Sequence, residues 1–142
     1  MVCPWNKFAA TAREAKLQAR QDLTAPSLAM LASFDDASFR AFFSSSPIKR
    51  VGHARFLRNV LVAIGNSGDR ELAAVAQEKL THDSPLVRGM AVWALARLLG
   101  EDALRELAQA HLGNEVDASV RAEWQEEIRA LSLSNARAEI AA

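Results

Sequence analysis

The residues of this chain best suited to chemistry form a cluster of cations early in its central segment: Lys49, Arg50, His53, Arg55 and Arg58. No aspartate or glutamate occurs from Ala37 to Gly68, a stretch that holds five lysines and arginines. Binding of a polyanion depends on the field at the contact rather than on the total charge of the protein. The cluster therefore predicts a phosphate-binding surface, although the formal net charge of the whole chain is zero.

The positive segment is balanced elsewhere, because residues 101–142 carry four bases against nine acids. Two interpretations of the basic segment stay open. It is either an RNA-binding surface, in which cations displace counterions from phosphates, or an ordinary solvated helix face. The residues alone, with five bases and no acid over 32 positions, do not decide between the two. Asn59 is a weaker candidate for a contact to ribose or base, since asparagine near a helix end more often serves as a cap.

The elements around this cluster are predicted to be helices. Leu57, Val60, Leu61 and Ile64 recur at i, i+3, i+4 and i+7, which is one apolar stripe of a helix, with Arg55, Arg58 and Asn59 towards its other side. We expect this central helix to follow directly on a Ser46 cap with Pro47 at its first position. Gly65 should weaken its last turn, and residues 66–69 should end it and cap the next helix.

Further helices are predicted on both sides of the central one. The expected spans are Lys7–Asp22, a short helix capped by Ser27, another capped by Asp35 or Asp36, Glu71–Leu80, Pro85–Leu99, Glu101–His111, and a last helix from Asp117 to Leu131 with frayed residues beyond. Phe39, Phe42, Phe43 and Phe56 are expected in the core. Trp93 is expected to pack against an adjoining helix rather than to stack on a base.

A repeat underlies these helices. Leu57-Arg58, Val87-Arg88 and Val120-Arg121 each lie early in the second helix of a predicted pair, at separations of 30 and 33 residues. The run from Asp83 to Leu98 resembles the second-helix signature of HEAT repeats. We therefore predict an all-α fold of HEAT-like helical repeats, an α-solenoid of two to three helix pairs with short helices before it. Arg88 and Arg121 are expected to have structural roles.

Other chemistry finds little support in the sequence. Cys3 is the single cysteine, which excludes an intramolecular disulfide. The three histidines are far apart and lack the spacing of a zinc site, and no hydrolase or nucleotide-binding motif occurs. The apolar runs are far shorter than the ~20 residues of a membrane helix, and the N-terminus does not resemble a signal peptide. We expect a cytoplasmic protein.

Three stretches together resemble the C-terminal part of tRNA epoxyqueuosine reductase. They are VCPWNKFA at residues 2–9, SPIKRVGHARFLRNVLVAIGNSGD at residues 46–69, and the HEAT-like run from Ser84 to Leu98. The resemblance implies an enzyme that uses cobalamin and two 4Fe-4S clusters to reduce epoxyqueuosine at the tRNA wobble position. It also implies that the helical repeats hold the tRNA. Cys3 then matches the last cysteine of the ferredoxin-like segment, a cluster ligand.

The chain departs from that family upstream of Cys3. A 4Fe-4S cluster is held by four thiolates, and the chain has one cysteine; the cobalamin-binding domain and the catalytic acid have no counterpart. We therefore expect a C-terminal fragment that does not catalyse alone and binds neither cofactor by itself. Its expected parts are the end of the ferredoxin-like segment (1–8), connecting helices (9–45) and the repeat domain (46–142).

The expected partners are the tRNA anticodon stem-loop and the missing N-terminal catalytic and ferredoxin-like domains, with the chain itself a monomer. The expected tRNA-binding residues are Lys49, Arg50, His53, Arg55, Arg58 and Asn59. An alternative is a stand-alone HEAT-repeat module that binds a protein partner through its second helices. A fragment without function, prone to aggregate through exposed helix faces, is a third possibility.

Overall fold

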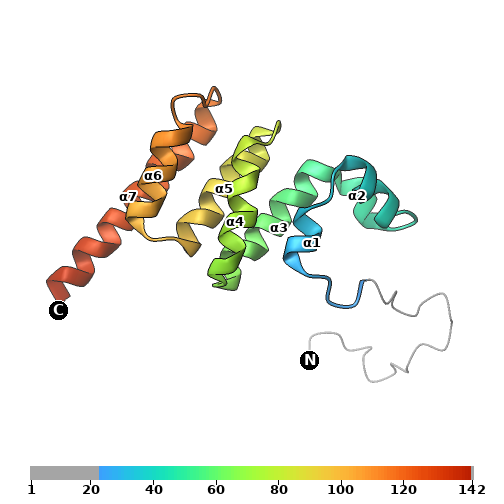
Figure 1. The fold of residues 1–142 in the computed structure, drawn as a ribbon, viewed down its shortest axis with the longest axis horizontal. Helices are drawn as coiled ribbons and strands as arrows, with labels where there is room; N and C mark the ends of the chain where they lie inside the picture. The colour runs from blue at the N-terminus through green and yellow to red at the C-terminus, as the bar shows by residue number, and fades with distance from the viewer. Residues whose placement is uncertain (1–22, 142) are drawn as a thin grey trace, which may run out of the picture.

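The computed structural model describes residues 23–141, and within this range helices follow one another with no strand. Figure 1 shows them stacked side by side along the long axis of the molecule. The predicted all-α solenoid is thereby confirmed. The expected helix at Lys7–Asp22 and the candidate ligand Cys3 lie outside the described residues. No helix in the described range is long and apolar enough to cross a membrane.

Two short helices precede the repeats, α1 (Leu28–Ala32) and α2 (Asp36–Phe42). Both begin at the predicted caps: the Ser27 hydroxyl accepts the Met30 N–H at 3.2 Å, and the Asp35 carboxylate accepts the Ser38 N–H at 2.7 Å. These caps fix where each helix begins and so direct the phenylalanines of α2 towards the body of the protein.

The phenylalanines form one aromatic cluster under α2. Phe39 and Phe43 are buried, and Phe56 packs against both with ring centroids 5.0 Å apart in each case. Phe42 and Phe56 are half-buried at the edge of the cluster. The expectation of core positions is confirmed for Phe39 and Phe43, whereas Phe42 and Phe56 are only partly buried. The cluster joins α2 to the first turn of α3.

The central helix does not begin at Pro47 as predicted. Residues Pro47–Val51 form a separate 3-10 helix (η4), capped by the Ser46 hydroxyl, and α3 (His53–Ser67) begins only after Gly52. Gly52 has φ of 82°, which a residue with a side chain rarely adopts, so the chain turns there instead of continuing as one helix. The end of α3 is as predicted, with Gly68 left-handed and Asp69 capping the next turn.

The remaining helices form the expected pairs. The segment predicted as Glu71–Leu80 consists of η5 (Arg70–Leu72), α4 (Ala73–Glu78) and η6 (Lys79–Thr81). It is followed by α5 (Pro85–Leu98), α6 (Glu101–His111) and α7 (Ala118–Ala141). In Figure 1, α4 lies against α5 and α6 against α7, while α3 is the second helix of the first layer.

The second helices carry the core. Helix α5 packs between α3 and α7, and the residues at the repeated position, Leu57, Val87 and Val120, are each at most 1% exposed. The predicted stripe Leu57, Val60, Leu61 and Ile64 is buried throughout. The sequence repeat therefore corresponds to a structural repeat, in which each second helix buries an equivalent face against its neighbours.

Helix α7 continues ten residues beyond the predicted end at Leu131. Its extension is attached to the first turn of α6, because the Glu101 carboxylate accepts hydrogen bonds from the Ser132 hydroxyl and, at 2.8 Å, from the Asn135 amide. The expectation of frayed residues beyond Leu131 is therefore wrong, because these polar contacts hold the extension in place.

Gly65 permits a close approach between α3 and α5. A Cβ at this position would lie 2.6 Å from the Trp93 ring and 3.0 Å from the Ala94 Cα. Trp93 therefore packs on α3, as predicted. Gly65 is not merely a weak point in its helix, since its missing side chain is what lets the two helices meet.

We predict that Gly65→Ala lowers the free energy of unfolding by about 1–3 kcal/mol, because α5 must move away, although alanine is the better helix former. Gly89→Ala in α5 is the matched control, because a Cβ there meets nothing nearer than 3.9 Å. It should leave stability unchanged or raise it. Urea denaturation of both variants measures the difference, and equal behaviour of the two would contradict the packing role of Gly65.

Candidate nucleic-acid interface

The predicted cations lie on η4 and on the first turns of α3. Lys49 and Arg50 are exposed on η4 and, with residues 45–47, line a surface depression of about 550 Å³. Arg55, Arg58 and Asn59 are exposed on the first turns of α3 and line a second depression of about 370 Å³. We call the five residues Lys49, Arg50, Arg55, Arg58 and Asn59 the basic surface.

His53, the sixth predicted residue, points away from this surface. Its Nε2 donates to the Phe34 carbonyl at 2.7 Å, and its ring lies 5.7 Å from that of Phe39 and 6.2 Å from that of His82. Five of the six predicted residues are thus exposed, in two groups on η4 and α3, and His53 makes contacts that join α3 to the preceding segment.

The cations of the basic surface are not neutralised by neighbouring acids. Ion pairs in the described range join Arg40 to Asp36, Arg88 to Glu115 and Arg105 to Glu101, and none involves Lys49, Arg50, Arg55 or Arg58. Asp36 therefore neutralises Arg40, the fifth cation of residues 37–68, and the other four remain without an ion pair in the described range. The N-terminal end of α3, with no acidic residue in its first turn, adds its positive dipole end to the same side.

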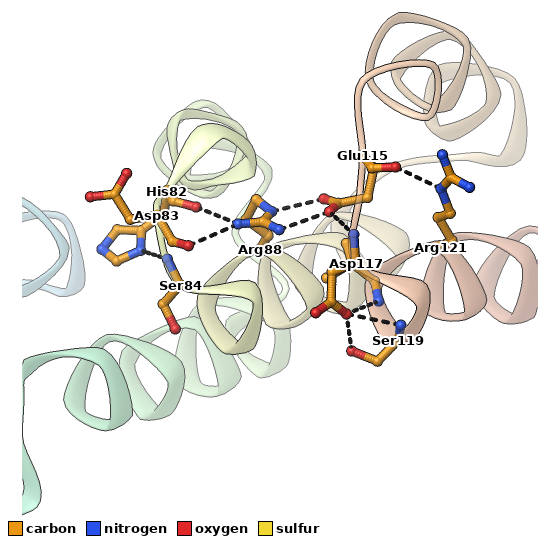
Figure 2. A network of polar contacts seen from close by, with 9 residues as sticks. His82, Asp83, Ser84, Arg88, Glu115, Asp117, Ser119 and Arg121 are labelled. Carbon is orange, nitrogen blue, oxygen red and sulfur yellow. Dashed lines mark hydrogen bonds and ion pairs between the residues drawn. The ribbon is translucent and has the colours of Figure 1, made fainter.

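The equivalent arginines of the later repeats behave differently from Arg58. Figure 2 shows that Arg88 binds Glu115 through two hydrogen bonds, of 2.8 Å from Nε and 2.7 Å from Nη2, and reaches back to the His82 carbonyl at 2.9 Å. Arg121 likewise donates to the Glu115 carbonyl at 2.6 Å. Each arginine thus bonds the residue six positions earlier, and their structural role is evident from these contacts.

Arg58 lacks both of these partners. The residue six positions earlier is Gly52, whose unusual backbone directs the chain differently, and the structure gives no bond from Arg58 to it. The position equivalent to Glu115 in the turn before α5 is His82. His82 and Glu115 each accept a hydrogen bond from the backbone N–H two residues later. Ser84 N–H donates to His82 Nδ1 at 3.0 Å, and Asp117 N–H donates to Glu115 Oε1 at 2.8 Å.

A histidine at this position cannot pair with Arg58 as a carboxylate would. Burial, and then the nearby charge of His53, lower the pKa of His82, which favours the neutral ring. Arg58 instead donates a 3.4 Å hydrogen bond from Nη1 to Asn59 Oδ1. Sequence reasoning missed this substitution, which aligning the turns at residues 82 and 115 could have revealed.

A depression between the C-terminal end of α3, α5 and α7 is lined by charges of both signs. Glu126 and Glu127 on α7 line a depression with Arg97, and burial raises the pKa values of Glu123 and Glu127. Arg97 lies over the Trp93 ring, 4.1 Å from its centroid. Acids and bases are interspersed along α7, unlike the acid-free stretch of residues 37–68 that contains η4 and the start of α3.

The described residues contain no group of three or more histidine, cysteine, aspartate or glutamate side chains that could hold a metal ion. Cys3 lies outside them, and one cysteine does not supply the four thiolates of a 4Fe-4S cluster. The residues present do not fit that cofactor. What the basic surface offers chemically is recognition of phosphate by guanidinium and ammonium groups.

Comparison with known proteins supports the fold and the resemblance. Residues 52–129 match the family of HEAT repeats. The epoxyqueuosine reductase of Xanthomonas campestris is 42% identical over 98 residues, which cover 68% of this chain and 28% of that protein. The epoxyqueuosine reductase of Escherichia coli K12 is 34% identical over 97 residues, 68% of this chain and 26% of that protein.

The chain therefore spans little more than a quarter of the length of these relatives. No solved structure matches it. The predicted resemblance to epoxyqueuosine reductase is confirmed, whereas the expected division at residues 8 and 45 stays a prediction.

We predict that Glu115→Gln destabilises the protein by about 1–3 kcal/mol at neutral pH, because the Arg88 guanidinium, whose side chain is 14% exposed, loses its charged partner. The hydrogen bonds from Arg88 hold the pKa of Glu115 below its usual 4.5. The stabilisation is therefore complete above that value and is lost as the pH falls through the lowered pKa.

Urea denaturation at about pH 7 and about pH 3 measures this effect. The difference between wild type and Glu115→Gln should shrink in acid. Glu106→Gln, an exposed residue of α6, is the control for removing one charge. A difference that is the same at both pH values would contradict the role given to the ion pair.

Proposed function

Because this chain belongs to the HEAT-repeat family and its relatives are epoxyqueuosine reductases, we propose that it is the helical-repeat region of such an enzyme and docks the tRNA anticodon arm. Reduction of epoxyqueuosine to queuosine is then the task of a catalytic domain outside this chain. The cytoplasm, where tRNA is modified, is the proposed location.

The observation that carries the proposal is the basic surface. Four cations lie exposed around η4 and the first turns of α3 without an ion-pair partner in the described range. Each phosphate that such a side chain contacts releases condensed counterions, which gives affinity that falls with salt. An incidental solvated face would ordinarily intersperse acids among the bases, and residues 37–68 have none.

A surface that holds an RNA backbone also suits an enzyme that modifies a tRNA base. A wobble base must leave its stack before an enzyme can act on it, and unstacking costs a few kcal/mol. A rigid surface that holds the backbone beside that base supplies binding energy for this step. Helices α3 and α5 provide such rigidity, because they are packed along their lengths in the core. Cobalamin and the iron-sulfur clusters belong to the remainder of the enzyme.

We predict that the chain binds an anticodon stem-loop RNA with an affinity that falls steeply with salt. The double variant Arg50→Gln/Arg55→Gln should weaken binding roughly tenfold or more at ~0.1 M salt and reduce the slope of log K against log salt by about two. The reason is the loss of two phosphate contacts. Fluorescence anisotropy over a salt series measures both quantities.

The matched control is Arg129→Gln/Arg137→Gln, which removes the same charge from exposed positions of α7. It should leave the affinity and the slope close to wild type. If both double variants weaken binding equally, the interaction reflects overall charge and not the basic surface. Absence of RNA binding at low salt would favour the alternative of a protein-binding HEAT module.

A footprint tests which part of the tRNA is held. With full-length tRNA bound, we expect hydroxyl-radical protection confined to the anticodon stem and loop, because the basic surface occupies only the α3 end of the solenoid. Protection should disappear with Arg50→Gln/Arg55→Gln at the same protein concentration. Protection centred on the acceptor arm would contradict anticodon docking while leaving RNA binding intact.

A further inference from the structure

The depression between α3 and α5 has a mixed lining that phosphate binding alone does not explain. Its polar side is formed by Arg55, Arg58 and Asn59, and its apolar side by Val51 and Leu86. Its volume of about 370 Å³ lies near the lower end of the range of ligand sites, about 300–1,000 Å³. The space suits one small planar group with its attached anion.

The two aliphatic side chains are unusually exposed for their size. Val51 is 40% and Leu86 44% exposed, and they lie beside guanidinium groups in the same depression. Pro85 fixes the first turn of α5, which places Leu86 opposite α3. Burial of such side chains against a ligand releases free energy in proportion to the apolar area covered.

The polar side chains set the charge of the occupant. Arg55 and Arg58 are three residues apart on α3 and so project from the same helix face. No ion pair in the described range involves either of them. Asn59 Oδ1 is engaged by Arg58, which leaves its amide nitrogen to donate to an acceptor. The occupant therefore carries an anion and an adjacent flat apolar surface with hydrogen-bond acceptors at its edge.

We propose that this depression binds one unstacked nucleotide of an RNA loop. Its base lies against Val51 and Leu86, and its phosphate contacts Arg55 and Arg58. A paired base hides both faces in the helical stack, so the site requires single-stranded RNA. This inference rests on the proposed function, since it specifies how the basic surface recognises its RNA.

Abasic substitution separates base recognition from phosphate binding. We expect Leu86→Ala to weaken binding of the anticodon stem-loop about tenfold, with an unchanged salt slope, because no phosphate contact is lost. Replacing one loop nucleotide by an abasic residue should weaken wild-type binding similarly. With that RNA, Leu86→Ala should have no further effect, because the same contact is already missing.

Leu133→Ala is the matched control, since Leu133 is an exposed leucine of α7, 54% exposed. It should bind every RNA as wild type does. Val51→Ala provides a second variant of the apolar wall, with an expected loss of about three- to fivefold on the intact loop only. Circular dichroism confirms that each variant is folded before its affinity is measured.

The outcomes distinguish the two proposals. If wild type binds RNA with a steep salt dependence but neither Leu86→Ala nor any abasic position matters, the nucleotide site is wrong and the phosphate-binding surface remains. Equal weakening of intact and abasic RNA by Leu86→Ala also overturns the site. If wild type binds no RNA, the proposed function itself fails.

Discussion

Burial of α5 between α3 and α7 is the constraint on which the rest of the structure depends. An isolated helix of this length is marginal in water, and α5 is held by apolar contacts on both sides, including Val87, Ala91 and Leu95. The proposed interface depends on this helix in two ways. Its first turn forms one wall of the nucleotide depression, and its packing fixes where α3 presents arginines.

A second constraint acts between the turns. Arg88 joins the turn before α5 to the turn before α7, since it binds His82 and Asp83 on one side and Glu115 on the other. Charged hydrogen bonds of this kind are directional, so they fix the register of adjacent repeats more sharply than apolar packing does. The same sequence position in the first repeat has no such partner, and there the arginine is available for a ligand.

The repeat positions were predictable from the sequence because apolar periodicity and turn residues report burial directly. Leu57, Val87 and Val120 were identified by spacing alone, and the ends of α3, α5 and α6 followed from glycine, proline and capping residues. The basic segment was also visible as a run without acids. These patterns are local in the sequence. They predict the fold of a solenoid well because each repeat contacts only its neighbours.

What the sequence did not reveal depends on contacts between distant residues. The break at Gly52 required knowledge of its backbone angle, and the extension of α7 depends on Glu101, which lies more than thirty residues before its partner Asn135. The inward direction of His53 follows from the Phe34 carbonyl, and the wall formed by Leu86 comes from a different repeat than Arg55. Residue types alone do not specify such pairs.

The contact between Gly65 and Trp93 fixes where α3 and α5 approach most closely. Helices α3 and α5 run in the same direction, and they touch closely near their C-terminal ends while their N-terminal ends border the depression. Arg55 lies ten residues from Gly65, about 15 Å along the helix. The way the two helices cross at the glycine therefore determines how far apart their first turns lie, and with them Arg55 and Leu86. The missing side chain at Gly65 thus bears on the geometry of a depression that it does not itself line.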